Sequence, residues 1–398
     1  MKFEHVWAAI IAGGKGTRLF PISHPDCPKQ FCQMNERETF IQATVRRLRT
    51  LGIAASKIVV ITTNSRQLEL AKRQLLPLGV LSVNIYQINE RFGYAGAMVK
   101  AAEFIRKNDE KAVIVNTPAD QYIGKEKEFT EVMLTAIREA EMGLPVMVGV
   151  KTGDIVTAMG CGHVSYEGKG PIFDKIGDFI EKPDRETAEV ILRYDNTACN
   201  TGINVWSAKT LLETISSGEI GSSGLATDVL MNRFKKVRVA VGHFIWFDCG
   251  TLKAIYDINS NIATPNHKNV SIGSGCDQVD RTGCQNNLFY TINGVEIDAT
   301  GLENVAVVAN NINNKIFIGV VALDQSQKVR DLAEHFADEG LVSNYFTIDG
   351  VNNVSMPSNL PRKNYQVGFV GVNNCAVYVH KDRRGDIRVA VSNLAYWE

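Results

Sequence analysis

Two features of the 398-residue sequence predict a doubly wound α/β domain with a mainly parallel, Rossmann-like sheet, followed by a smaller β-rich domain. First, short apolar runs alternate with helical patterns over residues 6–150. Second, the later part of the chain changes to short strand patterns separated by Gly, Asn and Asp turns. The length is sufficient for two or three domains, each with a full core.

Five apolar, β-branched runs are predicted as strands buried on both faces, because helices cover both sides of a doubly wound sheet. They lie at residues 6–12, 57–62, 83–88, 112–117 and 145–150. Between them, apolar residues recur at helical spacing in residues 40–51, 98–105 and 129–140. Hairpin-like strands with one or two helices are predicted for residues 151–242, and a strand, turn and helix for residues 244–262.

A domain boundary is predicted at residue 265, where Pro265 and Asn266 interrupt the pattern, giving domains 1–265 and 266–398. The second domain is predicted to be a stacked β-unit, with a short β-helix as one form, although no clean six-residue repeat is visible. A helix predicted over residues 326–340 would divide it near residue 340 from an all-β end.

The overall charge excludes some classes of protein. Lys and Arg number 43, as do Asp and Glu, which argues against nucleic-acid binding through bulk charge and against a polybasic membrane surface. The apolar run at residues 6–12 is too short for a signal-peptide core or a bilayer span. The eight cysteines are scattered without a C-x-x-C pair, so reduced, mostly buried thiols in a cytoplasmic protein are expected, and zinc is not.

The stretch "IIAGGKGTRLFPISHPDCPKQF", residues 10–31, combines glycines with positive charge directly after the first strand. This position is the carboxyl edge of the sheet, where open α/β folds bind ligands, and glycines there let backbone N–H groups approach a phosphate. The stretch is not a Walker A loop. The third glycine of a dinucleotide fingerprint would fall on Leu19, so neither an ATPase nor an NAD enzyme is predicted.

The ordered residues "AGGKGTRLFPIS…PKQF" resemble the signature of sugar-1-phosphate nucleotidyltransferases, and most closely that of the bacterial mannose-1-phosphate guanylyltransferases. The resemblance implies attack of a sugar-phosphate oxygen on the α-phosphorus of a nucleoside triphosphate, with release of pyrophosphate. It implies catalytic cations at Arg18 and Lys29; a solvated loop side chain is the alternative for Lys15. The nucleotide-binding loop would comprise Ala12, Gly13, Gly14, Lys15, Gly16, Thr17 and Arg18.

Two aspartates are implied as metal ligands. Asp120 ends the stretch "NTPAD" and Asp248 lies in "WFDCGTLKA", and both stretches resemble segments of the family that hold the metal. The resemblance therefore implies that Asp120 and Asp248 bind Mg²⁺ and that Asp120 is catalytic. The alternative for an isolated aspartate after a strand is a turn or cap residue.

Further stretches imply the sugar-phosphate and nucleoside sites. "MGCGHV", "FIEKPD" and "CNTGINVW" imply sugar-phosphate binding by Gly162, Glu181, Lys182 and Asn200. "NERFGYAGAMVKAA" implies nucleotide binding by Glu90, Tyr94 and Gly96. This last stretch departs from the family's "E-P-x-x-R-N-T-A-P-A", which leaves the base open. "PADQ" for "PADH" and "CNTG" for "WNSG" leave the sugar open.

The resemblance covers about the first 265 residues and implies a cytoplasmic enzyme of nucleotide-sugar and polysaccharide biosynthesis that makes GDP-mannose from GTP and mannose 1-phosphate. It also implies a dimer formed through the C-terminal β-unit. The alternatives are another triphosphate, another hexose or heptose 1-phosphate, or a non-catalytic regulatory subunit that binds a nucleotide-sugar. Retention of the charged residues argues against the regulatory subunit; they are Arg18, Lys29, Asp120, Lys182 and Asp248.

Overall fold

The protein divides into two compact units in a computed structural model. One unit contains Met1–Gly14 and Phe40–Asp248, and the other contains Lys15–Thr39 and Cys249–Glu398. The chain therefore passes between the units inside the signature stretch, before Phe40, and after Asp248. The structure describes residues 3–14, 19–35, 37–88, 93–153, 155–168, 170–214, 236–260, 269–273, 284–312, 315–328, 345–348, 351–355, 365–381, 384 and 386–393.

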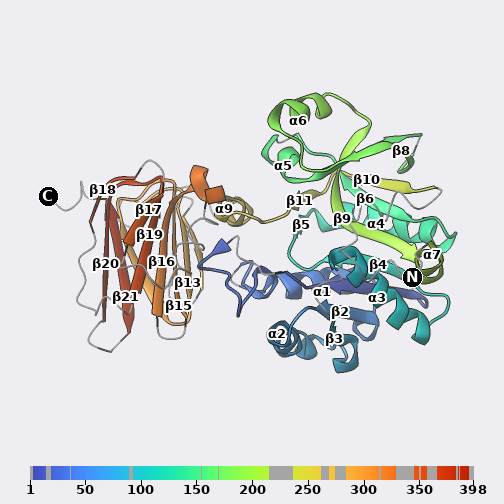
Figure 1. The fold of residues 1–398 in the computed structure, drawn as a ribbon, viewed down its shortest axis with the longest axis horizontal. Helices are drawn as coiled ribbons and strands as arrows, with labels where there is room; N and C mark the ends of the chain where they lie inside the picture. The colour runs from blue at the N-terminus through green and yellow to red at the C-terminus, as the bar shows by residue number, and fades with distance from the viewer. Residues whose placement is uncertain are drawn as a thin grey trace. The chain divides into compact units, whose positions relative to one another are not determined.

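The first unit is built on a nine-stranded sheet with the order β3-β2-β1-β4-β9-β6-β10-β8-β7 (Figure 1). The strands β1, β2, β3 and β4 are parallel to one another, as the sequence predicts. The bounds are β1 Val6–Ile11, β2 Ile58–Thr62, β3 Ile85–Gln87, β4 Val113–Pro118, β6 Val146–Val150, β7 Gly162–Glu167, β8 Ile172–Ile180, β9 Thr197–Ser207 and β10 Arg238–Gly242.

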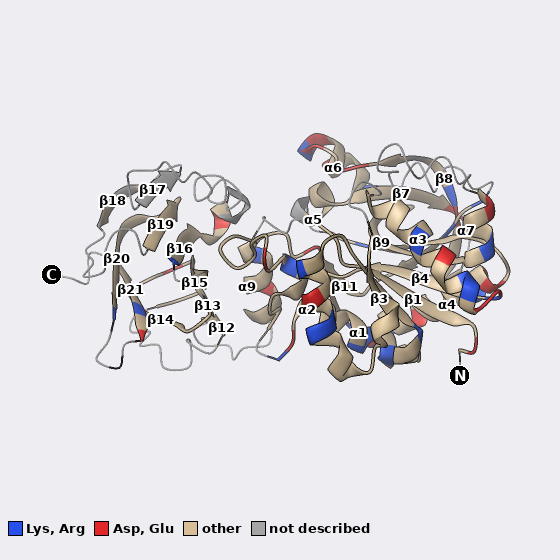
Figure 2. Ribbon diagram, turned by 60° about the horizontal axis from the view of Figure 1, so that its bottom comes forward, with Lys and Arg blue, Asp and Glu red and all other residues tan. Residues whose placement is uncertain are grey.

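Every residue of β1, β2 and β6 is buried. This burial indicates that both faces of the sheet are covered, as expected for a doubly wound fold. Figure 2 shows the charged residues gathered on the helices, whereas these strands carry none. The helices predicted between the first strands are confirmed. The bounds are α1 Phe40–Thr50, α2 Ser65–Leu75, α3 Gly93–Asn108, α4 Glu126–Glu141, α5 Ile155–Gly160, α6 Arg185–Ile191 and α7 Ala208–Thr214.

The second half of the sheet is mixed rather than parallel. Strand β9 lies antiparallel between β4 and β6 and also pairs with β7. β10 is parallel to β6 but antiparallel to β8. This mixed half corresponds to residues 151–242, for which the sequence predicts hairpin-like strands, and it gives β9 three strand partners.

A two-stranded ladder lies outside the large sheet. β5, Tyr122–Gly124, pairs antiparallel with β11, Ile245–Phe247, so that Phe247 faces Tyr122. The segment before β5 and the segment after β11 therefore meet at the same end of the ladder.

The second unit contains a six-stranded sheet, β12-β13-β15-β16-β19-β17, and a four-stranded sheet, β14-β21-β20-β18. Side chains from both sheets share one apolar core that includes Phe289, Val377 and Val389. The bounds are α9 Leu252–Ser260, β12 Val270–Ile272, β13 Leu288–Ile292, β14 Val295–Thr300, β15 Val305–Ile312, β16 Lys315–Ala322, β17 Tyr345–Ile348, β18 Asn352–Ser355, β19 Tyr365–Val370, β20 Asn373–Lys381 and β21 Ile387–Asn393.

Three strands of the six-stranded sheet repeat every 18 residues: β13 pairs in parallel with β12 and β15, so that Leu288 faces Val270 and Ala306. Asn287 joins the successive turns. Its Nδ2 donates to Leu302 O at 2.7 Å and its Oδ1 accepts from Val305 N at 2.9 Å. The stacked β-unit that the sequence predicts therefore has an 18-residue period in this part of the chain. The helix predicted over residues 326–340 lies outside the described residues beyond a short 3₁₀ segment, Leu323–Lys328.

The later part of the signature stretch packs within this second unit. Leu19, Phe20 and Ile22 belong to an apolar cluster with α9 and the six-stranded sheet. Tyr290 donates to Gln33 O at 2.7 Å, and Asn310 donates to Pro21 O at 2.7 Å. Contacts thus group this segment with the β-rich unit, while a boundary at residue 265 stays a prediction.

Among the described residues, no helix combines the length and apolarity that crossing a membrane requires.

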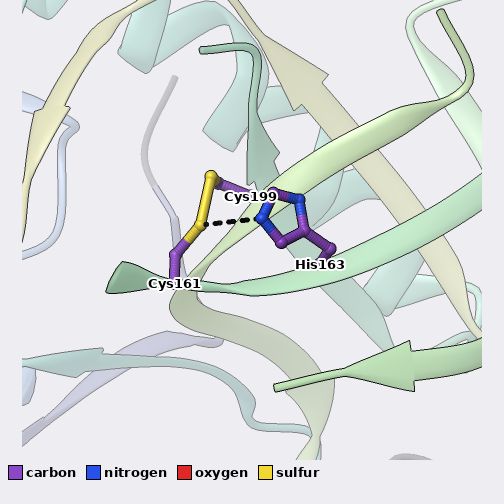
Figure 3. A group of neighbouring side chains, drawn as sticks. All are labelled: Cys161, His163 and Cys199. Carbon is purple, nitrogen blue, oxygen red and sulfur yellow. Dashed lines mark hydrogen bonds between the residues drawn. A yellow bond between two sulfur atoms is a disulfide. The ribbon is translucent and has the colours of Figure 1, made fainter. Parts of the chain in front are cut away.

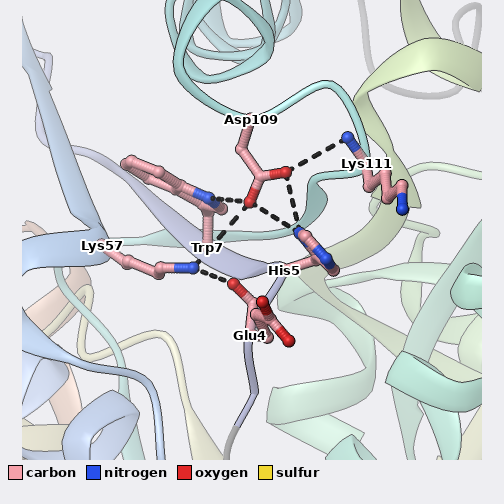
Figure 4. Close-up of polar contacts among 6 residues, drawn as sticks. All are labelled: Glu4, His5, Trp7, Lys57, Asp109 and Lys111. Atoms are coloured by element: carbon pink, nitrogen blue, oxygen red, sulfur yellow. Dashed lines mark hydrogen bonds and ion pairs between the residues drawn. The ribbon is translucent and has the colours of Figure 1, made fainter.

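A polar network forms before β1 and after α3 (Figure 4). The Asp109 carboxylate accepts from Trp7 Nε1 at 3.0 Å and from Lys111 N at 3.2 Å, and His5 Nδ1 lies 2.9 Å away. The Lys57 ammonium lies 3.8 Å from the same carboxylate. Burial opposes ionisation of Asp109, but the hydrogen bonds from Trp7 and His5 outweigh it, so the pKa of this carboxyl is lowered.

Asp109→Asn is expected to lower the free energy of unfolding at neutral pH by about 1–3 kcal/mol, because it removes a hydrogen-bonded charge from the network. A lowered pKa in the folded state means that the carboxylate stabilises the protein above its unfolded pKa of about 4 and that this contribution is lost as the pH falls. Denaturant unfolding from neutral pH to about pH 3 should therefore show the difference from wild type shrinking with acid. Glu110→Gln at the exposed neighbour is the control; a difference that stays constant with pH contradicts the assignment.

Candidate active site

The start of the signature stretch forms a tight turn after β1. Ala12 N extends the parallel ladder by donating to Ile61 O at 2.8 Å. A Cβ atom at Gly13 would lie 2.9 Å from Thr63 Cγ2, and Gly14 has a φ of 102°, so both positions require glycine. Gln67 Nε2, on α2, donates to Gly14 O at 2.9 Å. The turn of Gly13 and Gly14 is therefore held against Thr63 and α2.

The remaining residues predicted to bind the triphosphate and nucleoside fall into two groups, those outside the described residues and Lys29. Lys15, Gly16, Thr17, Arg18 and Glu90 are outside them. Lys29 belongs to the second unit, where it begins a 3₁₀ turn, Lys29–Phe31, and is 6% exposed.

The ladder of β5 and β11 brings the two predicted metal ligands to one place. Asp120 lies two residues before β5, and Asp248 follows β11 directly. Because Phe247 faces Tyr122, continuing the antiparallel register places Asp248 beside Gln121, the neighbour of Asp120. Two carboxylates more than a hundred residues apart in the sequence thus share one end of a ladder.

The "CNTG" turn of β9 is tied to the same region. Gln121 Nε2 donates to Thr201 O at 2.6 Å, and the Tyr94 hydroxyl donates to Gly202 O at 3.1 Å. Burial, followed by the negative charge of Asp120, raises the pKa of Tyr94 above its usual range. Tyr94 therefore stays a neutral donor, close enough to Asp120 to sense its charge. Gly96, also on α3, is buried.

Three of the four predicted sugar-phosphate residues converge on one pair of strands. Gly162 on β7 faces Asn200 on β9 directly. A Cβ atom at Gly162 would lie 2.7 Å from Glu181 Oε2 and 2.1 Å from Phe179 Cζ, so the Glu181 carboxylate lies over the glycine. Asn200 Oδ1 accepts from Gly202 N at 3.1 Å, which joins this group to the turn held by Tyr94 and Gln121.

Lys182, the fourth residue, is attached to the same group through its backbone. Lys182 N donates to Cys161 O at 3.3 Å, and its φ of 42° is left-handed. Its ammonium lies 3.5 Å from Glu181 Oε1, and both side chains are more than half exposed. An exposed ion pair of this kind contributes little to stability. Breaking it so that each side chain contacts a ligand would therefore cost little free energy.

Sequence reasoning missed three supporting residues and one bond. Gln67, Gln121 and Gly202 hold the groups above in place; Gln121 and Gly202 lie in the quoted stretches "PADQ" and "CNTG", whereas Gln67 carried no signal. The expectation of reduced thiols is wrong for Cys161 and Cys199, because they form a disulfide. Among the described residues, Cys27, Cys32, Cys249, Cys284 and Cys375 form no disulfide, and Cys276 lies outside them.

A cavity of about 540 Å³ lies in the second unit, beside α9 and the turns that lead into β15 and β20. Lys253, Glu303, Asp324 and several asparagines line it, but no predicted site residue does. The candidate active site is therefore defined by the side chains described above.

Comparison with known families decides the class of protein. The family model described as nucleotidyl transferase matches residues 7–265, which contain every predicted site residue. The chain belongs to the nucleotidyl transferase family. Members transfer a nucleotidyl group from a nucleoside triphosphate to a sugar 1-phosphate and use a divalent metal ion.

Curated relatives match this nucleotidyltransferase over most of its length. A mannose-1-phosphate guanylyltransferase of Escherichia coli is 24% identical over 365 residues, covering 82% of this chain and 74% of the relative. A putative mannose-1-phosphate guanylyltransferase of Vibrio cholerae is 26% identical over 361 residues, covering 83% of this chain and 74% of the relative.

A solved structure has the same fold. The crystal structure described as a mannose-1-phosphate geranyltransferase from Thermus thermophilus matches with a TM-score of 0.68 and 23% sequence identity. The match covers 83% of this chain and 99% of that chain, so the likeness includes part of the β-rich unit as well as the α/β domain.

Gly162→Ala in this nucleotidyltransferase is expected to raise the KM for the sugar 1-phosphate about tenfold or more, because the new methyl group displaces Phe179 and Glu181. The KM for the triphosphate should change little. Steady-state kinetics with each substrate varied in turn measures both. Gly160→Ala is the matched control, since no heavy atom lies within 4 Å of its added Cβ. Equal effects of the two substitutions would contradict the placement of Gly162 at the sugar.

Proposed function

We propose that this nucleotidyltransferase transfers a guanylyl group from GTP to mannose 1-phosphate, giving GDP-mannose and pyrophosphate. The observation that carries the proposal is the convergence of Asp120 and Asp248 at one end of the β5–β11 ladder. The hydrogen bonds of Gln121 and Asn200 connect that point to the Gly162–Asn200 pair. The names of the relatives and the "PKQF" form of the signature favour guanine and mannose.

The two aspartates fit a hard divalent cation, and we propose Mg²⁺, because carboxylate oxygens are its preferred protein ligands. Such an ion neutralises phosphate charge. Asp120 and Asp248 would hold it. The proposed role of Tyr94 is to keep the "CNTG" turn against this point, since its hydroxyl bonds Gly202 O.

The triphosphate is proposed to lie against the loop of residues 12–18, with Arg18 as a bidentate partner and Lys29 as a point charge. The turn at Gly13 and Gly14 supports this assignment. The Gly14 carbonyl accepts a hydrogen bond from Gln67 Nε2, which fixes the orientation of the turn. Glu90, Tyr94 and Gly96 remain proposed as the nucleoside segment. Lys15 is proposed as a further contact to phosphate.

The sugar phosphate is proposed to lie on the β7–β9 pair. Asn200 Oδ1 is already used by Gly202 N, so its amide Nδ2 is the group that would donate to a sugar hydroxyl. Glu181 would accept from hydroxyls over the Gly162 backbone, and Lys182 would leave Glu181 to pair with the phosphate. No covalent intermediate on the protein is required.

We also propose a cytoplasmic dimer formed through the β-rich unit, with no nucleic-acid or membrane partner. The even balance of acidic and basic residues supports the last point. The rival function is a regulatory subunit that binds a nucleotide-sugar without turnover. It is disfavoured because Asp120, Asp248 and Lys29 are all retained.

The function is tested by pyrophosphate release with GTP, ATP, UTP and dTTP, each against mannose, glucose and a heptose 1-phosphate, in the presence of Mg²⁺. We expect the largest kcat/KM for GTP with mannose 1-phosphate. A larger value for another pair would replace the proposed substrates. Tight binding of GDP-mannose with no release from any pair would favour the regulatory subunit.

Asp120→Ala and Asp248→Ala are each expected to lower kcat by about 100- to 1,000-fold, because each removes a ligand that offsets phosphate charge. The thermal unfolding midpoint should stay close to that of wild type, since both side chains are partly exposed. Asp195→Ala, at an exposed turn, is the control. Near-normal turnover in either variant would remove that residue from the metal site.

A further inference from the structure

The disulfide between Cys161 and Cys199 joins the two strands that carry Gly162 and Asn200 of the proposed sugar-phosphate site (Figure 3). The two Cα atoms are 5.8 Å apart, a separation that permits the bond without backbone movement. Cys161 immediately precedes β7, and Cys199 lies on β9. Both are buried, at 4% and 1% exposure. The bond therefore fastens β7 to β9 from within the core.

Every proposed sugar-phosphate residue adjoins this bond. Gly162 and Asn200, which face each other, each follow one of the two cysteines in the chain. Lys182 N donates to the carbonyl of Cys161, and Glu181 lies over Gly162. A change in the separation of the two sulfur atoms is thus transmitted to the whole group through single covalent or hydrogen-bonded steps.

Reduction has to change that separation. A covalent S–S bond is about 2.05 Å long, whereas two thiols that only touch are farther apart. Cys27 and Cys32, which form no disulfide, show the difference within the same protein, because their sulfur atoms lie 3.9 Å apart. The backbone next to Cys161 is closely surrounded, since a Cβ atom at Gly162 would lie 2.1 Å from Phe179 Cζ. A shift of this backbone on reduction would therefore change the contacts of Gly162 with Phe179 and Glu181.

His163 completes the surroundings of the bond. Its Nε2 lies 2.8 Å from Ala158 O and 3.6 Å from Cys161 Sγ. Burial, partly offset by the bond to Ala158, lowers the pKa of His163, so the ring is neutral and Nε2–H donates to the carbonyl. Cys161 Sγ therefore has a polar, neutral neighbour in the His163 ring. The thiolate is the form of cysteine that takes part in thiol–disulfide exchange.

We propose that Cys161 and Cys199 form a thiol–disulfide couple that sets the affinity of the enzyme for its sugar 1-phosphate. The identity of the affected ligand rests on the proposed function. The disulfide holds Gly162 and Asn200 in register. Reduction to two thiols lets the proposed sugar-phosphate residues move apart and weakens sugar-phosphate binding. A cytoplasm keeps most thiols reduced, so the couple would link the activity of the enzyme to the redox state around it.

Formation of the disulfide needs an oxidant, and a small-molecule disulfide such as glutathione disulfide can supply it. The Cys161 thiolate attacks one of its sulfur atoms, forming a mixed disulfide and releasing one glutathione thiolate. The Cys199 thiolate then attacks Cys161 Sγ, and the second glutathione thiolate leaves. The two protein sulfurs lose two electrons and the two glutathiones gain them. Because both cysteines are buried, local opening of the strand pair must precede attack.

The first experiment measures the couple itself. The purified protein is equilibrated with glutathione and glutathione disulfide in varied ratio, alkylated in denaturant, and mapped by mass spectrometry. We expect Cys161 and Cys199 to become protected together, with a single midpoint. Thiols that stay open to alkylation under oxidising conditions would overturn the proposal. So would one equivalent of zinc retained by the reduced protein, because Cys161, His163 and Cys199 would then be metal ligands.

The second experiment measures the consequence. Dithiothreitol is expected to raise the KM for mannose 1-phosphate about three- to tenfold, as for the weakening of one or two hydrogen bonds, with the KM for GTP unchanged. Cys161→Ser and Cys199→Ser should show the raised KM and no response to dithiothreitol. Cys375→Ala, at a buried free thiol of the second unit, should respond as wild type does. A couple that forms but leaves every KM unchanged overturns the proposal.

Failure of the proposed function is distinguishable from failure of this inference. Mapping of the disulfide needs no substrate, and wild-type protein in the two redox states needs no variant to fold. If no substrate pair is turned over, calorimetric titration of GDP-mannose and of mannose 1-phosphate into the oxidised and the reduced protein replaces the kinetics. Equal affinity in both states would then overturn the inference, and weaker binding to the reduced protein would support it.

Discussion

The pairing of β9 with three other strands is the constraint on which the site depends. β9 lies antiparallel to β4, β6 and β7, so strand pairing fixes its residues 197–200 and 204–207, and the bonds from Gln121 and Tyr94 hold Thr201 and Gly202 between them. Asn200 and Gly202 are therefore held where β7 and the segment after β4 converge. A parallel strand in the place of β9 would carry these residues to the opposite end of the sheet. The proposed metal site and the proposed sugar-phosphate site are connected because β9 contributes residues next to each of them.

The signature stretch is divided between the two compact units, although it reads as one motif. Its first glycines belong with the sheet, where Thr63 and Gln67 hold the turn. Its later part belongs with the β-rich unit, since Leu19 and Phe20 are buried against that unit's strands. A sequence pattern cannot show this division, because an apolar residue after a loop looks the same whichever core it enters.

The candidate site could be named from the sequence to the extent that motifs carry their own chemistry. The stretches around Asp120, Glu181 and Asn200 indicated oxygen ligands and hydroxyl partners. Among the supporting residues, Gln121 was visible only as a departure from the family pattern, and Gln67 could not be found, because glutamines occur in many surface helices and turns. The disulfide was missed for a related reason: Cys161 and Cys199 are far apart in the chain, and only the β7–β9 register makes them neighbours.

Local patterning by itself determined the α/β class, the first parallel strands, the helices between them and the β-rich end. Those features follow from apolar periodicity and turn residues, which act over a few positions. The mixed half of the sheet, the 18-residue repeat with its Asn287 contacts, and the ladder that brings Asp120 and Asp248 to the same end were decided only by the tertiary structure. Each depends on strand order and register between distant segments, and the energy that selects them comes from long-range pairing and burial rather than from any short stretch.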